Sequence, residues 1–343
     1  MKQTIEISFR TILKVFLVIF LIIFAYFIRD ILAIIFFALI IASAVSAPVR
    51  WLKKYHIPRI LGVIIVYVTS ITLLGLMLVL VIPPLANELR QLSEFIPQIT
   101  ERFSAGVETF RQYAQQESQI QEFLLSLSKK LKQLRINFLA LTGNVVSGVA
   151  VFVATFVISF YLAVEEEGIK KFIQALTPKS QEAYAVQLWE RTQKKLGRWL
   201  GAQLFLGFVI GLLTFIGLKI LGLPYALSLA ILAGIFELIP FVGPILAAIP
   251  AVIIAFIKSP FLALLTIIVY VVIQQAEGNI LVPKVMQKTV GINPVITIIV
   301  LLIGAKLAGI IGVLLAIPLA MLLAEFGKDF FEKSPGFQRI KAR

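Results

Sequence analysis

Long apolar runs alternate with short polar or proline-containing breaks along the first two thirds of the chain. Each of the first five runs has room for a membrane-spanning helix, because about 17 to 25 helical residues cross a hydrocarbon core of about 30 Å. These runs cover residues 11–28, 31–47, 60–82, 138–164 and 200–221. The pattern predicts an all-α, polytopic helical membrane protein. Arg29 and Asp30 are expected to form a tight polar turn, and Pro48 to end the second helix.

A different periodicity appears at residues 85–137, after the third run. Apolar residues recur there at steps of three or four, the amphipathic helical period. They are Leu85, Leu89, Leu92, Ile96, Ile99, Phe103, Val107 and Phe110, then Ile120, Leu124, Leu127, Leu131 and Leu134. We expect a pair of long extramembrane helices whose apolar stripes are covered by each other or by neighbouring subunits, which favours a homo-oligomer. Helices lying on the membrane surface are the alternative.

Basic segments set the expected orientation. Residues 48–59 contain four lysines and arginines and no acid, and the tail 328–343 is also basic. Positive loops stay on the cytoplasmic side, so both termini are expected there. The predicted parts are three spans in 1–84, the insert 85–137, a fourth span 138–164, a cytoplasmic helical linker 165–198, a transport core 199–327 and the tail 328–343.

Two apolar segments in the C-terminal half are interrupted at their centres. Residues 224–257 contain ELIPFVGP, and residues 294–325 contain GAKLAGIIG. Each arm of the first segment has about 15 residues, or about 22 Å of helix, which is short for a crossing. Irregular backbone at membrane depth survives only inside protein or beside a cavity. We therefore predict two re-entrant helical hairpins, with two thin full crossings as the alternative.

The two interrupted segments resemble each other in sequence. Pro224 and Pro294 begin them, 70 residues apart, and Gly234 and Gly304 have the same separation. The prolines of the similar phrases AIPAVIIA and AIPLAMLLA lie 68 residues apart. The repeating unit is therefore one span followed by one hairpin, and the two units are expected to run in opposite directions. Inverted repeats of this kind are typical of transporters, whose substrate site lies near the bilayer midplane, here between the hairpin tips. Chance similarity between apolar sequences is the alternative.

Two charged residues lie at the predicted tips. Glu237 precedes Pro240 by three residues, and Lys306 lies 69 residues after Glu237. A carboxylate near membrane depth is unfavourable by at least a few kcal/mol, so it needs a partner or a function. If the repeat is real, the two charges could approach each other and exchange their ion pair for a substrate or a proton. A static pair, or charges at a water interface, is the alternative.

Helix-breaking and amide residues complete the candidate site. Prolines free backbone carbonyls, and glycines allow close approach, so either kind can build an ion or substrate site; a packed turn without a ligand is equally compatible. The candidates are Pro240, Gly243, Pro244, Gln203 and Gln274, with Gly234, Pro250, Gly304, Gly309, Gly312 and Pro318 as hinge or hairpin positions. The amides of Gln203 and Gln274 could instead join helices. Glu277 is expected in a wet cytoplasmic turn over 277–288.

Composition narrows the function classes. The chain is 59% hydrophobic with a mean hydropathy of +0.98, has no cysteine and contains His56 as its one histidine. We therefore expect no metal and no cofactor. The net charge of +14 fits basic loops beside anionic lipid, so the lipid bilayer is the expected partner and nucleic acid is not. No P-loop motif and no nucleophile constellation is present, so we do not expect an enzyme. Any transport is then driven by gradients, or supplied with energy by another chain.

Three phrases resemble the autoinducer-2 exporter family of PerM-like permeases. They are ELIPFVGPILAAIP (237–250), GNILVPKVMQKTVGINP (278–294) and GIIGVLLAIP (309–318). A mid-chain FYL followed by Glu165 is similar to the family pattern, in which Asp is more usual near that point. The resemblance implies a multi-span transporter in a prokaryotic inner membrane.

The resemblance leaves the transported species open, because it implies autoinducer-2 exporters and sodium(lithium)/proton antiporters alike. The leading hypothesis is a secondary transporter that exports a small polar solute such as autoinducer-2. A cation/proton antiporter is the first alternative. A membrane scaffold that recruits partners through its insert is the second, although broken apolar helices would give a scaffold no advantage.

Overall fold

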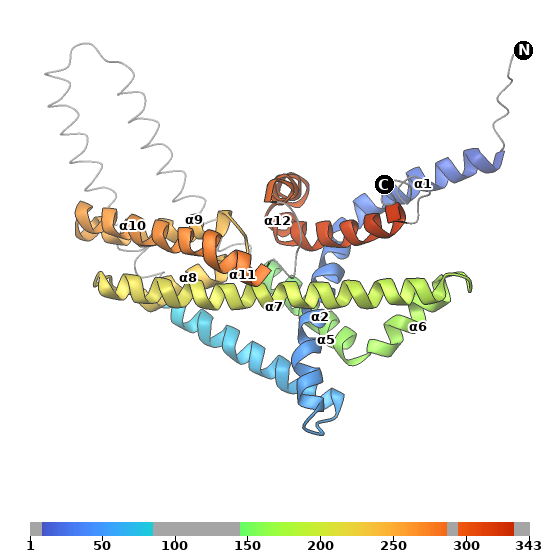
Figure 1. The fold of residues 1–343 in the computed structure, drawn as a ribbon, viewed down its shortest axis with the longest axis horizontal. Helices are drawn as coiled ribbons and strands as arrows, with labels where there is room; N and C mark the ends of the chain where they lie inside the picture. Colours follow the sequence, from blue (N-terminus) through green and yellow to red (C-terminus); the bar gives the residue numbers. More distant parts are fainter. Residues whose placement is uncertain (1–8, 85–144, 287–293, 333–343) are drawn as a thin grey trace, which may run out of the picture. The chain divides into compact units, whose positions relative to one another are not determined.

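The computed structural model describes residues 9–84, 145–286 and 294–332. Those residues form helices and connecting turns, with no strand among them (Figure 1). Five of the described helices are long and apolar enough to cross a membrane. The predicted all-α polytopic class is confirmed. The predicted amphipathic insert, 85–137, lies outside the described residues.

The first two helices are nearly continuous. α1 covers Phe9–Phe27 and α2 covers Arg29–Lys53. The N–H of Ile28 donates to the carbonyl of Phe24 at 3.1 Å, and the N–H of Leu32 donates to the carbonyl of Ile28 at 2.9 Å. The tight polar turn expected at Arg29 and Asp30 is wrong, since both residues lie in the first turn of α2.

Pro48 does not end α2, which continues to Lys53. Val45 and Val49, on either side of the proline, are both buried. A proline in a helix interior removes one hydrogen bond, but stopping the helix there would also remove the burial of Val49. The expectation that Pro48 ends the helix is therefore wrong.

The third predicted span, and the part of the fourth that the structure describes (from residue 145), are present as helices. One helix covers Arg59–Pro84, and α5 covers Val145–Val164. Arg59 donates Nε and Nη2 to the carbonyl of Ala163, at 3.0 and 2.7 Å. A guanidinium is suited to this double contact because its donors lie in a fixed fork. The contact fixes the end of α5 to the beginning of the Arg59–Pro84 helix.

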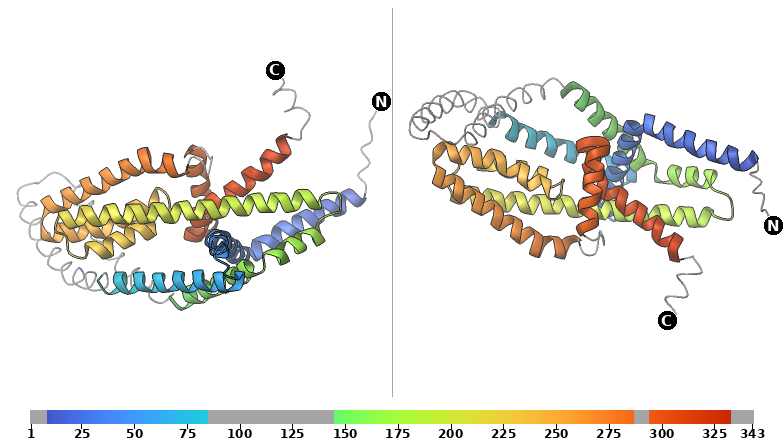
Figure 2. Two further views of the ribbon diagram at one scale, coloured as in Figure 1. Left: turned by 60° about the horizontal axis from the view of Figure 1, so that its bottom comes forward. Right: turned by 90° about the horizontal axis from the view of Figure 1, so that it is seen from above.

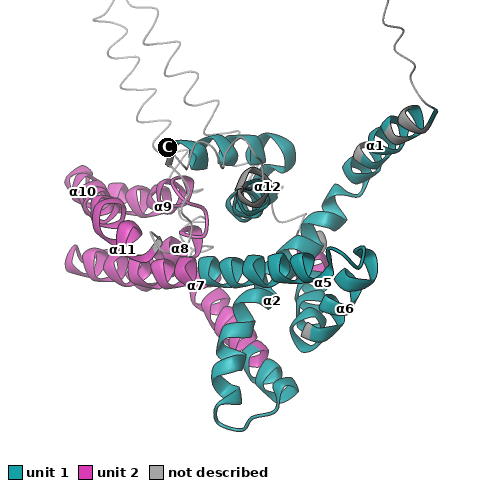
Figure 3. Ribbon diagram, turned by 45° about the vertical axis from the view of Figure 1, so that its right-hand side comes forward, with its two compact units in different colours: residues 1–66, 153–200, 289–343 teal, residues 67–152, 201–288 magenta. Residues whose placement is uncertain are grey.

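The second part of the polar linker and the fifth predicted span share one helix. α6 covers Glu166–Leu176, and α7 then runs without a break over Glu182–Ile220. The described chain divides into two compact units, and the division falls inside α7 between residues 200 and 201 (Figure 3). Unit 1 comprises residues 1–66, 153–200 and 289–343; unit 2 comprises residues 67–152 and 201–288.

Unit 2 contains the first interrupted segment as two helices. α8 covers Ala226–Phe236 and α9 covers Val242–Lys258, and the two pack together. α10, Pro260–Ala276, packs along α9 (Figure 2). A small apolar core joins these helices to the end of α7. Its buried members are Leu218, Leu223, Ala226, Leu229, Ala251, Ile254, Ala255 and Ala263.

The segment after α10 remains helical. The π-helix η1 covers Glu277–Leu281, and α11 covers Val282–Met286. The expected polar turn over 277–288 is therefore wrong for residues 277–286. The π-helical step widens the helix where the sequence becomes polar, so the backbone keeps its hydrogen bonds without reversing direction.

Unit 1 contains the second interrupted segment. α12 covers Pro294–Glu332 and has non-helical backbone at Ala308 (φ −144°, ψ 23°) and Gly309 (φ 58°, ψ −135°). A positive φ suits glycine, because a Cβ would be strained there. The helix is thus interrupted inside GAKLAGIIG, as the sequence predicts.

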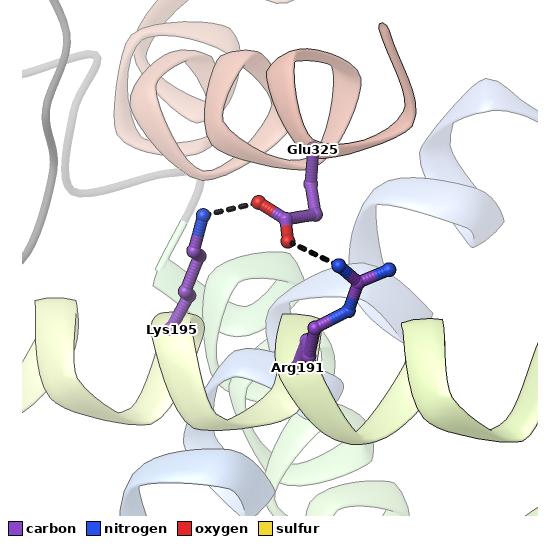
Figure 4. A network of polar contacts seen from close by, with 3 residues as sticks. All are labelled: Arg191, Lys195 and Glu325. Carbon is purple, nitrogen blue, oxygen red and sulfur yellow. Dashed lines mark hydrogen bonds and ion pairs between the residues drawn. The ribbon is translucent and has the colours of Figure 1, made fainter. Parts of the chain in front are cut away.

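A buried carboxylate joins α12 to α7 within unit 1 (Figure 4). The side chain of Glu325 is 7% exposed and forms ion pairs with Lys195 and with Arg191, the latter at 3.5 Å. Arg191 and Lys195 are one helical turn apart on α7, so a single carboxylate reaches both. Removing the carboxylate would leave two cations without this partner.

Candidate functional site at the break between α8 and α9

The break between α8 and α9 spans residues 237–241 in unit 2. Its turn is closed by backbone bonds, from the N–H of Val242 to the carbonyl of Pro240 and from the N–H of Gly243 to that of Ile239, both 2.8 Å. Phe241 adopts φ 66°, which is rare for a bulky residue and marks a strained turn. Such strain is common at functional sites.

Gly243 is required at the beginning of α9. A Cβ built on Gly243 would collide with the carbonyl oxygen of Phe236 at the end of α8. The two helix ends therefore approach more closely than any residue with a side chain allows. Pro240 lies in the turn and Pro244 in the first turn of α9, so the predicted helix breakers do form the break.

Glu237 lies directly after the last residue of α8. Its N–H donates to the carbonyl of Ala233 at 3.0 Å, and the residue is only 1% exposed. Its Oε2 atom is buried and has no hydrogen-bond donor in the described parts of the chain. A buried carboxyl oxygen without a donor is energetically unfavourable, so this position is a strong candidate for ligand or proton binding.

A glycine contact holds α8 against α7 beside Glu237. A Cβ on Gly207 would lie 2.5 Å from the carbonyl oxygen of Gly234, and a Cβ on Gly234 would lie 2.6 Å from that of Gly207. The same Gly207 Cβ would be 3.7 Å from the Cβ of Glu237. Gly207 is absent from the predicted set. Its only sequence signal is GFVIG, a GxxxG pattern in an apolar span, which is typical of close helix packing.

Gln203 fixes the backbone at the break. It is 1% exposed, and its Nε2 donates a short hydrogen bond to the carbonyl of Glu237. This carbonyl follows the last full turn of α8, where intrahelical donors run out. The structure thus brings the predicted residues Gln203, Gly234 and Glu237 together.

Glu277 completes the site and is the main residue that sequence reasoning misplaced. It begins η1, is 6% exposed, and accepts a hydrogen bond at Oε2 from Nε2 of Gln274 at 3.0 Å. Its carboxyl group is also close enough to the Glu237 carboxyl for the two groups to interact electrostatically. Glu277 is therefore buried in the site and not in a wet turn. Its spacing of three from Gln274 at the end of an apolar run is the signal that could have located it.

An open apolar groove of about 450 Å³ lies along α9 and α10 and reaches this site. Its lining includes Pro244, Tyr270 and Gln274. Its other lining residues are apolar, and they include Ile249 and Ile267. A mostly apolar groove with a few polar groups is suited to a small amphipathic ligand or an acyl chain.

The second break lies in unit 1. A Cβ on either Gly304 or Gly312 would meet the carbonyl oxygen of the other, so the two arms of α12 touch across the kink at Gly309. Lys306 is exposed on the first arm. Pro318 is fully buried on the second arm. Pro250 lies inside α9 and does not interrupt that helix.

The two breaks have the same spacing as the sequence matches, whereas the repeat itself stays a prediction. The kink at 308–309 lies 70 residues after 238–239, which falls inside the first break. Glu237 and Lys306 belong to different units. Their approach to each other, and the inverted arrangement of the two segments, stay predictions.

The chemistry of the site is that of paired carboxyls and amides. Among the residues that the structure describes, no group of three or more His, Cys, Asp or Glu side chains could hold a metal ion. A buried carboxyl in a broken apolar helix of a multi-span protein is typical of membrane transport proteins.

Comparison with known proteins identifies the family. The model for the AI-2E family transporter matches residues 15–331. YueF of Bacillus subtilis (strain 168) is 32% identical over 85% of this chain and 83% of its own length. YrrI of the same organism is 30% identical over 84% of this chain and 84% of its own length. The AI-2 transport protein TqsA of Escherichia coli (strain K12) is 24% identical over 92% of this chain and 89% of its own length. The chain belongs to the AI-2E transporter family.

Proposed function

We propose that this chain is a gradient-driven secondary transporter that exports a small polar solute, with Glu237 at the break between α8 and α9 in its substrate site. The observation that carries the proposal is the buried Oε2 of Glu237, which has no donor among the described residues. A buried carboxyl oxygen without a hydrogen-bond donor needs a functional reason, and substrate or ion binding supplies one.

Autoinducer-2 is the first solute to test, because the related Escherichia coli protein is named an AI-2 transport protein. The predicted site lies between the tips of two re-entrant hairpins near the bilayer midplane, with Lys306 contributed by the second. We place the protein in a prokaryotic inner membrane as a homo-oligomer with both termini in the cytoplasm. We infer a carrier and not an enzyme.

The direct test is solute flux in liposomes that contain the purified protein. An imposed ion gradient should drive autoinducer-2 across the membrane, and Glu237→Gln should abolish the driven flux. The matched control is Glu167→Gln, since Glu167 is exposed on α6 and should tolerate the change. Flux that is unchanged in the double variant Glu237→Gln, Lys306→Met would contradict the assignment of the site.

The hairpin geometry has its own test, because the chain lacks cysteine. Single cysteines at positions 237–244 and 304–312 should show restricted labelling by membrane-impermeant thiol reagents, as expected for a sheltered polar pocket. Full labelling from bulk solvent would contradict re-entrant hairpins and the carrier with them. Silent hairpin variants, together with partner capture by the insert, would support a scaffold.

A sodium(lithium)/proton antiporter is the second candidate, and the proximity of the Glu237 and Glu277 carboxyls favours it. In everted membrane vesicles, a fluorescent pH probe should report proton movement when sodium is added. No response between about pH 6 and pH 9 would exclude this candidate, because that window surrounds the titration range of a buried carboxyl.

A further inference from the structure

We propose that α6 is an interfacial helix, which lies along the boundary between the headgroups and the acyl chains of the lipid leaflet where α5 ends. Phe172 and Leu176 form the surface that enters the leaflet, and lipid is its partner. The inference goes beyond the proposed transport function, because it holds whichever solute the protein carries. Every residue on which it depends lies in unit 1.

The sequence of α6 has one apolar and one charged face. Ile169, Phe172, Ile173 and Leu176 recur at steps of three and four residues, and the four charged residues of EEGIKKFIQAL lie on the other side of the helix. Ile169 and Ile173 are partly buried within the protein. Phe172 and Leu176 are 64% and 71% exposed, and they are one helical turn apart. They therefore form one continuous apolar surface.

The direction of α6 follows from its junction with α5, the fourth predicted span. Glu165 separates the two helices with φ −97° and ψ 56°, and the helices meet at an angle of 87°. Val157 and Tyr161 on α5 are exposed, as expected for side chains that face lipid. A helix at nearly a right angle to a membrane-crossing helix runs along the plane of the bilayer, so α6 takes that direction.

The level of α6 in the bilayer is marked by the neighbouring helix ends. Arg59, the last residue of the basic segment 48–59, donates to the carbonyl of Ala163, next to the end of α5. Trp51 and Tyr55 belong to the same segment; their ring centroids are 4.9 Å apart, and both residues are exposed. Tryptophan and tyrosine gather where the membrane meets water, and basic residues lie just outside it. α6 therefore begins at this boundary.

Two other locations for α6 agree less well with its side chains. In the hydrocarbon core, the four charged residues within its eleven positions would lose water, which is unfavourable. In bulk water, the surface of Phe172 and Leu176 would have no apolar cover. At the interface the apolar face enters the acyl chains while the charged face stays hydrated.

An ion pair connects the interfacial helix to the long helix α7. Nζ of Lys170 lies 2.8 Å from Oε1 of Glu190, which belongs to the first part of α7. The lysine lies on the charged face of α6, so this contact leaves the surface of Phe172 and Leu176 free for lipid. Attachment of α6 to the leaflet would thus hold the beginning of α7 at the membrane surface.

The test uses single cysteines that carry an environment-sensitive fluorophore, since the chain contains no cysteine. Phe172→Cys and Leu176→Cys report on the proposed lipid face. Gln174→Cys is the matched control, because Gln174 is also exposed and lies about 200° around the helix from Leu176. Val157→Cys is the deep reference, about 10 Å along α5 from its end. Each full-length protein is reconstituted into liposomes of phosphatidylethanolamine and phosphatidylglycerol.

Iodide on both sides of the membrane should quench the label at position 174 several-fold more than those at 172 and 176. A lipid quencher near the headgroup should quench the labels at 172 and 176 more than one at the chain end, and this order should reverse at 157.

Three results would overturn the proposal. Labels at 172 and 176 that are as open to iodide as the one at 174 would place α6 in bulk water. Labels that follow the pattern of position 157 would make α6 the second half of a broken span. Labels shielded from iodide and from both lipid quenchers would show that protein, and not lipid, covers this face.

Discussion

The contact between Gly207 and Gly234 gives the sharpest test of how the site is held together. The perturbation is Gly207→Ala, which adds one methyl group where α7 meets α8. That methyl carbon would lie 2.5 Å from the carbonyl oxygen of Gly234, whereas ordinary contact begins at 3.4 Å. The helices must therefore separate locally by about 0.9 Å, the difference between these distances. Backbone atoms form both sides of the contact, so no side chain can rotate away.

Overpacking of this kind destabilises a protein by about 1 to 3 kcal/mol. The matched control is Gly201→Ala on the same helix, because a Cβ at Gly201 meets nothing within 4 Å. Alanine has a higher helix propensity than glycine by up to about 1 kcal/mol, so the control should be neutral or stabilising. With the entropy of unfolding that is typical per residue, taken over 343 residues, a stability loss of about 2 kcal/mol lowers the unfolding midpoint by about 3 °C.

The assay is thermal unfolding of both variants in the same detergent, followed by flux in liposomes. Gly207→Ala should unfold at a lower temperature than Gly201→Ala. It should also lose driven flux, because moving α7 from α8 lengthens the hydrogen bond from Gln203 to the carbonyl of Glu237. Equal midpoints and equal flux in the two variants would refute the argument that the glycine contact positions the break.

Substitutions at three further positions test the supporting contacts, each by thermal unfolding. Glu325→Gln should destabilise unit 1 by about 2 kcal/mol, since the carboxylate is buried while its cations are partly exposed; an unchanged midpoint would argue against the ion pairs. Arg59→Lys should lower the free energy of unfolding by about 1 kcal/mol, because lysine cannot reproduce the two-donor contact with the carbonyl of Ala163. Arg59→Gln should lower it by at least as much. Ser259→Ala removes the hydroxyl that caps α10 by accepting a hydrogen bond from the N–H of Leu262 at 3.1 Å. This variant should lower the free energy of unfolding by about 1 kcal/mol, whereas Ser259→Asp should keep the cap and the stability.

The sequence predicted the class and the interruptions because both follow from local composition. Apolar runs predict spans wherever lipid is the solvent. The glycine and proline clusters predicted the break at 237–241 and the kink at Gly309. The errors arise where packing competes with a local rule. α2 passes through Pro48 because Val49 is buried beyond it, and the polar segment at Glu277 remains helical.

Pairing between distant segments could not be predicted from spacing alone. Glu237 and Glu277 are 40 residues apart, and no periodicity links them. Their proximity depends on α10 packing along α9 and on η1 directing Glu277 inward, which are tertiary features. Gly207 could not be chosen over Gly201 for the same reason. Both glycines occur in one apolar helix, and only the packing against α8 distinguishes them.

The spacing of basic residues on α7 gives the buried carboxylate of Glu325 two partners. Arg191 and Lys195 are separated by four residues, so they lie on one face of the helix, one turn apart. Glu325 forms ion pairs with both of them. A substitution at either cation would therefore still leave the carboxylate paired, and only the joint loss of both would leave it as a lone buried charge.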